Sequence, residues 1–197
     1  MARVKRPGRT RPGRLRIVAG KWRSRLLPVI DSPGLRPTSE RIRETLFNWL
    51  SPVIEGARCL DLFAGTGALG IEALSRGASE LVFIEESATV AAGIRRNLEV
   101  LEASNAEVRQ LDAFDYLNEA DPRPFDIVFL DPPFDIDVLG KFCGLLQQKG
   151  WLAANAAIYL EQNRDHAKLP LPDGWIISHE KVAGKVGYSL VRTGIET

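Results

Sequence analysis

The fold of this chain is decided by the segment Arg58-Cys-Leu-Asp61-Leu-Phe-Ala-Gly65-Thr-Gly67-Ala-Leu-Gly70-Ile-Glu-Ala-Leu74. Its apolar start is typical of a buried strand, its glycines indicate a tight turn, and Leu69, Ala73 and Leu74 recur at helical spacing. The letters satisfy G-x-G-x-x-G, which by itself is a weak signal for a nucleotide. Asp61 stands at the mouth of the same loop, where a carboxylate would repel a diphosphate and attract a cationic ligand. The segment therefore predicts a strand, a ligand-binding loop and a helix.

A second strand end carries an acidic side chain. The apolar run Leu81-Val-Phe-Ile84 precedes Glu85, which stands 24 positions after Asp61. This is the usual place for a carboxylate that binds a ribose diol in nucleotide-binding α/β units. Glu86 could take the same role, but strand alternation sends the two side chains to opposite faces. We favour Glu85, because it follows the apolar run directly.

A third short strand is indicated by the run Val108-Arg-Gln-Leu111. Asp112 and Ala113 follow it, and there a side-chain acceptor and a small residue could receive an adenine edge. A solvated surface acid is an equally good interpretation of Asp112, since aspartates are mostly exposed. Only its position after a strand favours the binding role.

The fourth strand pattern, Phe125-Asp-Ile-Val-Phe-Leu130, is followed at once by Asp131-Pro-Pro-Phe134. Prolines fix φ and lack a backbone donor, so the carbonyls at this corner are held rigidly as acceptors. The carboxylate of Asp131 beside them, with the ring of Phe134 for stacking, suits the exocyclic amino group of a nucleobase. Such dipeptides are also common in ordinary turns that end a strand. The motif alone therefore leaves open whether this corner is a nucleobase site or a simple turn.

The rest of the chain alternates strand and helix patterns, which predicts an α/β fold with a parallel sheet. Thr38 or Ser39 is expected to cap a helix with an apolar stripe at Ile42, Leu46, Trp49 and Leu50. The later elements are predicted as strands at 58–63, 80–85, 107–111, 125–130 and 156–161, helices at 66–76, 87–102, 113–119 and 136–149, and a closing hairpin of 175–181 and 186–192. The acidic strand ends then meet at the carboxyl edge of the sheet, where ligands of such sheets bind.

Taken together, these features resemble the class I S-adenosylmethionine-dependent methyltransferases over roughly residues 36 to 192. Asp131-Pro-Pro-Phe134 looks like the motif of their amino-methylating members. More closely, the run Arg36-Pro-Thr-Ser-Glu-Arg-Ile-Arg-Glu-Thr-Leu-Phe-Asn48, preceding Asp61-Leu-Phe-Ala-Gly-Thr-Gly67, is similar to the RsmD-type enzymes. Those enzymes methylate N2 of a guanine, number 966, in the 16S ribosomal RNA of the small subunit.

The resemblance implies a Rossmann-like sheet that ends in an antiparallel hairpin, and S-adenosylmethionine as the cofactor, with S-adenosylhomocysteine as product. It implies a catalytic corner at Asp131, Pro132, Pro133 and Phe134. It implies cofactor contacts at Asp61, Phe63, Gly65, Gly67, Glu85, Asp112, Ala113, Thr38 and Arg43. Arg36 and Arg43 would lie near the methionine carboxylate, although from the sequence alone both could equally be surface charges.

The net charge of +1 conceals a strong asymmetry. Residues 1–25 contain ten basic side chains and no acid, whereas the other 172 residues carry 16 basic and 25 acidic ones. A basic arm of this kind is typical of proteins that bind a polyanion. Pro7-Gly8 and Pro12-Gly13 prevent a continuous helix, so residues 1–13 are expected to be flexible. An organelle transit peptide is disfavoured, since the arm lacks the serines and the amphipathic helix of one.

Residues 14–30 are expected to form a basic β-hairpin that turns near Gly20-Lys21. We predict that it lies along RNA through Arg14, Arg16, Lys21, Trp22, Arg23 and Arg25. The chain is therefore expected to have three parts: the arm 1–13, the hairpin 14–30 and a methyltransferase domain at 36–197.

Composition sets further bounds. A chain of 197 residues with 45% hydrophobic content can bury one core, and no apolar run is long enough to cross a bilayer. Cys59 and Cys143 are expected as reduced core thiols, which suggests a cytoplasmic protein. His166 and His179 are isolated, so we predict no metal.

Three other functions remain open at this stage. A DNA adenine or cytosine amino methyltransferase would share the Pro-Pro motif, but such enzymes generally add a target-recognition domain. A protein glutamine methyltransferase would have little need for a basic arm. A non-catalytic RNA-binding module would leave Asp61, Glu85 and Asp131 without a reason to occupy successive strand ends.

Overall fold

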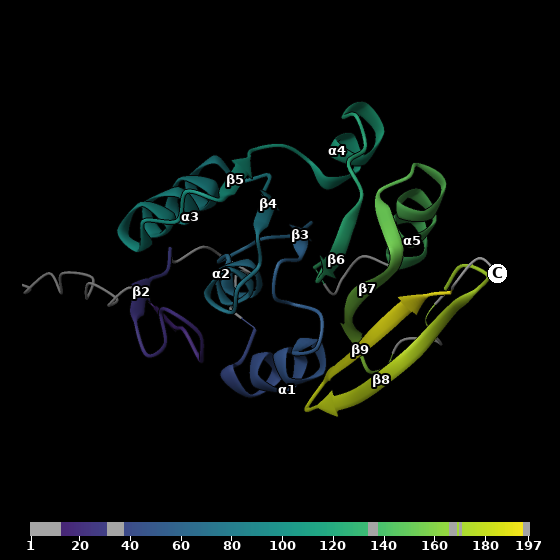
Figure 1. The fold of residues 1–197 in the computed structure, drawn as a ribbon, viewed down its shortest axis with the longest axis horizontal. Helices are drawn as coiled ribbons and strands as arrows, with labels where there is room; N and C mark the ends of the chain where they lie inside the picture. Colours follow the sequence, from purple (N-terminus) through teal and green to yellow (C-terminus); the bar gives the residue numbers. More distant parts are fainter. Residues whose placement is uncertain (1–12, 31–37, 134–137, 166–168, 170, 195–197) are drawn as a thin grey trace, which may run out of the picture.

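A seven-stranded sheet forms the centre of the computed structural model, which describes residues 13–30, 38–133, 138–165, 169 and 171–194 (Figure 1). The strand order across the sheet is β5-β4-β3-β6-β7-β9-β8. The strands are β3 (Arg58–Asp61), β4 (Glu80–Ile84), β5 (Ala106–Arg109), β6 (Phe125–Leu130), β7 (Leu152–Asn163), β8 (Trp175–Ala183) and β9 (Val186–Thr193). From β5 to β7 neighbouring strands pair in parallel, whereas β9 is antiparallel to both β7 and β8. The predicted mostly parallel sheet with a C-terminal antiparallel hairpin is therefore confirmed.

Within the described residues, five helices cover the two faces of this sheet. They are α1 (Glu40–Leu50), α2 (Ala68–Ser75), α3 (Ala88–Leu101), α4 (Ala113–Glu119) and α5 (Leu139–Gln148). Successive strand side chains point to opposite faces, so that Cys59 packs with α1, α2 and α3 while Leu60 packs with α4 and α5. Each face of the central strands is consequently apolar and buried, as a parallel sheet between two helical layers requires.

The predicted N-terminal hairpin is confirmed, although its strands are short. β1 (Arg14–Arg16) pairs antiparallel with β2 (Leu26–Pro28), with Leu15 opposite Leu27. Leu15, Ile17 and Leu27 are buried in the same apolar core as α1, α2 and α3. The hairpin therefore packs as part of the main core on one face and carries its basic side chains on the other.

Trp22 corrects one prediction for this hairpin. Its ring is only 6% exposed and belongs to the α1–α3 core, with Lys21 Nζ lying 4.2 Å above it. Its backbone N–H donates to the Ser75 hydroxyl at 3.1 Å, which fixes the turn against α2. The prediction that Trp22 lies on an RNA-facing surface is wrong, because this large ring is buried as an apolar anchor of the hairpin.

Helix α1 begins at Ser39, whose hydroxyl accepts from the Ile42 N–H at 3.3 Å. Of the two predicted caps, Ser39 is thus the one observed, and the Thr38 hydroxyl donates instead to Asp131. Ile42, Leu46 and Leu50 are buried as predicted. Trp49 departs from that stripe: it is only partly buried and stacks on the rings of His179 and Tyr188.

We predict that Gly70→Ala destabilises the fold, because a Cβ at this position of α2 would overlap the Phe83 ring and approach Leu81 within 2.9 Å. We expect the free energy of unfolding, measured by urea titration, to fall by about 1–3 kcal/mol. The matched control is Gly144→Ala within α5, where an added Cβ meets nothing within 4 Å. That variant should gain about 0.5–1 kcal/mol from its higher helix propensity. Equal changes in the two variants would contradict the close packing of α2 on β4.

Candidate functional site

The glycine loop between β3 and α2 is held by two of the predicted carboxylates. Gly65 and Gly67 adopt positive φ values of 50° and 76°, as the sequence predicted. The Gly65 N–H donates to Glu85 Oε2 at 2.9 Å. The Gly70 N–H donates to Asp61 Oδ2 at 3.1 Å. The end of β3, the end of β4 and the start of α2 therefore converge on one loop.

Glu85 lies directly after β4, with its other carboxylate oxygen accepting from the Ser87 N–H at 2.8 Å. Its side chain is half-buried, whereas Glu86 is exposed. Burial raises the pKa of Glu85, and the two backbone donors oppose that rise. The structure therefore separates the two acids as the sequence predicted, and the ribose role of Glu85 stays a prediction.

Asp112, Ala113 and Phe63 lie near the same edge of the sheet with structural roles of their own. Asp112 caps α4, since its Oδ1 accepts from the Phe114 and Asp115 N–H groups at 2.7 and 3.1 Å. Ala113 is buried in the α4–α5 core. Phe63 packs edge-to-face on Phe142, with ring centroids 5.0 Å apart. Contacts of these three residues with an adenosine group stay a prediction.

Three acidic side chains, Asp61, Asp131 and Glu161, lie together near the carboxyl edge of the sheet, and we call them the carboxyl cluster. Asp61 ends β3, Asp131 follows β6, and Glu161 lies near the end of β7. Asp61 is 2% and Glu161 5% exposed, and Asp131 is half-buried. Asp131 accepts from the Thr38 hydroxyl at 3.3 Å, and Glu161 accepts from the Tyr159 hydroxyl at 2.6 Å. Strand pairing thus brings two predicted site residues beside one that was not predicted.

The carboxyl cluster holds its protons more tightly than ordinary acids do. Burial, opposed by the Gly70 hydrogen bond and assisted by Glu85, raises the pKa of Asp61 to about 7. Burial and the nearby charges of Glu161 and Asp61 raise the pKa of Asp131 well above its usual range. Burial also raises the pKa of Glu161. In the described part of the chain no arginine or lysine forms an ion pair with these three groups, so the cluster favours a positively charged ligand.

Sequence reasoning missed Glu161, although a signal for it exists. The apolar run Ala156-Ala-Ile-Tyr-Leu160 precedes Glu161 just as apolar runs precede Glu85 and Asp131. The sequence predicts a strand at 156–161, in which Glu161 is the final residue. β7 in fact continues to Asn163, so Glu161 lies inside a strand and opposite Tyr188 of β9.

The motif after β6 is described in part. Pro132 is buried and Pro133 is exposed. Phe134, Arg36 and the arm 1–12 lie outside the described residues, and their roles stay predictions. Among the described residues no group of three histidine, cysteine or acidic side chains could hold a metal, and no helix there is long and apolar enough to cross a membrane.

Comparison with known proteins identifies the family. The family model described as "Conserved hypothetical protein 95" matches residues 15–192. The Escherichia coli K12 protein named ribosomal RNA small subunit methyltransferase D is 48% identical over 187 residues, covering 95% of this chain and 94% of its own. Its namesake from Haemophilus influenzae is 47% identical over 181 residues, covering 90% and 93%. The chain belongs to this family, the RsmD family.

Solved structures agree with this assignment. The structure of yhhF from Escherichia coli has a TM-score of 0.87 and 45% identity, covering 93% of this chain and all of that chain. An RNA methyltransferase from Salinibacter ruber in complex with S-adenosyl-L-homocysteine is 21% identical with a TM-score of 0.63, covering 82% and 96%. The second likeness concerns the fold alone. The class I methyltransferase fold predicted from the sequence is confirmed, and so is the resemblance to the RsmD type.

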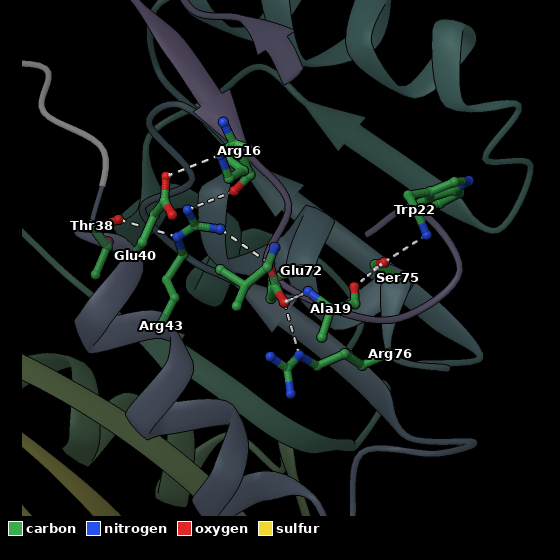
Figure 2. Close-up of polar contacts among 10 residues, drawn as sticks. Arg16, Ala19, Trp22, Thr38, Glu40, Arg43, Glu72, Ser75 and Arg76 are labelled. Atoms are coloured by element: carbon green, nitrogen blue, oxygen red, sulfur yellow. Dashed lines mark hydrogen bonds and ion pairs between the residues drawn. The ribbon is translucent and has the colours of Figure 1, made fainter. Parts of the chain in front are cut away.

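In this member of the RsmD family, a buried network holds the basic hairpin against α1 and α2 (Figure 2). Glu72 of α2 is fully buried and forms ion pairs with Arg43 at 3.1 Å and Arg76 at 2.8 Å. The backbone N–H groups of Val18 and Ala19 donate to the same carboxylate at 2.8 and 3.0 Å. Four donors from three segments therefore meet at one buried charge.

Arg43 corrects a second prediction. Its side chain is 2% exposed, and it donates to Glu72, to the Arg16 carbonyl at 2.8 Å and to the Thr38 carbonyl at 3.2 Å (Figure 2). Burial lowers the pKa of Arg43 and the charge of Glu72 opposes that effect. We therefore do not retain Arg43 as a ligand of the methionine carboxylate, because its positive charge is already neutralised inside the protein.

Removing the charge at the centre of this network should destabilise the RsmD-family fold strongly. Glu72→Gln leaves the guanidinium of Arg43 buried without a counter-charge, which we expect to lower the free energy of unfolding by about 3–5 kcal/mol. The control is Glu80→Gln, which breaks the partly exposed pair with Arg58 and should change it by about 1 kcal/mol or less. Urea unfolding of both variants measures the difference. Losses of the same size would show that Glu72 is not the anchor of the hairpin.

Proposed function

We propose that this chain transfers a methyl group from S-adenosylmethionine to N2 of a guanine in the ribosomal RNA of the small subunit, with guanine 966 as the target that the family resemblance implies. The observation that carries this proposal is the position of Asp131 and Pro132. They follow β6 directly and stand beside the buried acids at the ends of β3 and β7, next to the glycine loop. An amino-group acceptor and a cluster of acids that would attract a cation thus share one edge of the sheet.

The charge of the site fits the proposed cofactor. S-adenosylmethionine carries a sulfonium and an ammonium group and supplies an electrophilic methyl group when it is bound. Asp61 and Asp131, both with raised pKa, would be stabilised in their ionised form by such a ligand. Gly65 and Gly67 let the backbone approach the ligand closely, and Glu85 would accept from the ribose hydroxyls. We propose Asp112, Ala113 and Phe63 for the adenosine end and Thr38 for the region of Asp131.

The amino group of guanine is a weak nucleophile, because its lone pair is delocalised into the ring. Hydrogen bonds from its two protons to the Asp131 carboxylate and the Pro132 carbonyl would localise the lone pair on nitrogen. Alignment for in-line attack can supply roughly 7 kcal/mol or more of the rate enhancement. We propose stacking on the guanine for Phe134 and rigid support of the corner for Pro133.

The hairpin supplies a surface for a polyanion. Five basic residues on it are exposed: Arg14, Arg16, Lys21, Arg23 and Arg25. Phosphate neutralisation by such side chains provides affinity without sequence readout. Because N2 of a paired guanine is hidden, the target must be an unpaired or flipped nucleotide. The names of the Escherichia coli and Haemophilus influenzae relatives support the small-subunit ribosomal RNA as the source of that nucleotide.

The cofactor part of the proposal is tested by a matched pair of variants. We expect Glu85→Ala to raise the dissociation constant for S-adenosylhomocysteine at least about tenfold, since a hydrogen bond to a charged group contributes about 1.5–3 kcal/mol. Glu86→Ala, one residue along and exposed, should change it little. Isothermal titration calorimetry measures both constants. The opposite order of effects would assign the ribose to Glu86.

The catalytic part is tested by Asp131→Ala. We expect this variant to lose methyl transfer while it binds S-adenosylhomocysteine within a few-fold of the unmodified protein. Asp121→Ala, an exposed acid before β6, is the control and should keep its activity. The readout is mass spectrometry of nucleosides after incubation with labelled cofactor and ribosomal RNA from a strain that lacks the enzyme. A label on any product other than N2-methylguanosine would refute the proposed substrate, and loss of cofactor binding would place Asp131 in the cofactor site.

A further inference from the structure

We propose that Glu161 is a positioning residue that acts through Asp131, such that their two carboxyl groups form a pair that takes up the proton released by the methylated amine. The inference rests on the proposed function for the role of Asp131. It goes beyond that function because it assigns the destination of the proton to a pair of acids, one of which belongs to no motif recognised in the sequence.

Strand register places the two carboxyl groups side by side. β6 and β7 are parallel, with Phe129 opposite Tyr159 and Leu130 opposite Leu160. Asp131 follows Leu130 directly, and Glu161 follows Leu160. Side-chain alternation puts both on the face of Phe129 and Tyr159, toward α1. Since neighbouring strands lie about 4.7–4.9 Å apart, two acids level with each other on one face must interact.

Hydrogen bonds hold each member of the pair differently. Tyr159 is fully buried, and its hydroxyl donates to Glu161 Oε2 at 2.6 Å, so it stabilises the ionised form of Glu161. The Thr38 hydroxyl lies at 3.3 Å from Asp131 Oδ2, which is a longer and weaker bond. The charge is therefore held at Glu161, and a shared proton is favoured on Asp131. Asp131 is also the residue that we propose receives the proton from the substrate.

Among the described residues, a proton is the counter-charge available to the pair. The groups there that face the pair are Asp61 from β3, Thr38 just before α1, Tyr159 from β7 and Tyr188 from β9. None of these four is a cation, and Asp61 adds a further negative charge. Burial and the charge of Glu161 accordingly raise the pKa of Asp131, in keeping with two like charges that cannot both ionise cheaply.

The pair balances the charge of the reaction. As the new N–C bond forms, the S–C bond breaks with its electron pair on sulfur, and the nitrogen becomes positive. An N–H bond of that nitrogen then breaks, its electrons return to nitrogen, and the proton binds an oxygen of Asp131. Binding of the cationic cofactor displaces the shared proton to solvent, so the pair starts the reaction with both groups ionised and ends with one proton, while the sulfonium charge disappears. The net charge of the buried site is thus the same before and after methyl transfer.

The first test observes Asp131 without cofactor or RNA. Carbon-13 NMR of the side-chain carboxyl groups, with Asp131 assigned by Asp131→Asn, should show this group titrating well above the ordinary carboxyl range. Glu161→Gln keeps the size and the Tyr159 contact but removes the charge, so the midpoint for Asp131 should fall by at least about one pH unit, as expected for a coupled pair. The control Glu80→Gln removes a distant charge and should leave it in place. An unmoved midpoint in Glu161→Gln would overturn the inference.

Tyr159→Phe provides a second variant that keeps the apolar packing of the strand. It removes the donor that stabilises ionised Glu161, so the shared proton should move to Glu161 and the midpoint for Asp131 should again fall. A midpoint for Asp131 that stays in place or rises would contradict the pairing.

The pH dependence of methyl transfer separates this inference from the proposed function. The ionised form of Asp131 is the active one, so its raised pKa sets the acid limb of the rate profile. Glu161→Gln should move that limb to lower pH in single-turnover assays, and Glu80→Gln should not. A chain that shows the NMR shift but modifies no guanine would refute the proposed function and keep the pair. A chain that modifies guanine with an unmoved midpoint would refute the pair alone.

Discussion

A carboxylate that is removed from water must meet a positive charge or take up a proton, and this constraint organises the whole structure. Four acids lie on one side of the sheet away from bulk water: Asp61, Glu72 and Glu161 are buried, and Asp131 is half-buried. The charge of Glu72 is balanced within the protein by two guanidinium groups and two backbone donors (Figure 2). The other three form no ion pair in the part of the chain that the structure describes. Their charge is therefore available to a ligand, and this is what makes the sheet edge a binding site for a cation.

The Glu72 network and the carboxyl cluster are linked through Thr38. Its carbonyl accepts from Arg43, which belongs to the Glu72 network, and its hydroxyl donates to Asp131 in the carboxyl cluster. The same guanidinium donates to the Arg16 carbonyl in the basic hairpin. The surface proposed for RNA and the acid proposed for its amino group are thus joined by a short series of partly buried hydrogen bonds. This arrangement fixes the hairpin relative to the site, because the Arg43 guanidinium at its centre is buried and has few alternative partners.

Most of the fold could be predicted from the sequence, because long apolar runs and glycine turns are strong local signals. The strand 125–130 and the helix 113–119 were predicted at their observed bounds, and Asp61 and Glu85 were expected at the loop that they in fact hold. The errors concern residues whose role depends on tertiary partners. Arg43 and Trp22 look like surface groups in the sequence.

Contacts between segments that are distant in the sequence explain each of these errors. Arg43 is buried because Glu72 lies 29 residues away in sequence yet in contact with it. Trp22 is buried because the hairpin packs on α2. Glu161 was missed for a related reason: an apolar run precedes it, but its position beside Asp131 comes from the register between β6 and β7, which that local pattern does not encode.

We infer that the corner formed by Asp131 and Pro132 faces the reactive end of a cation bound at the carboxyl edge. A crystal structure with sinefungin, whose amine replaces the transferable methyl group, tests it most directly. We expect this amine to lie beside the carboxyl cluster, with the adenosine end at Glu85 and the glycine loop. An analogue bound elsewhere, or a corner that faces away from the amine, would contradict it.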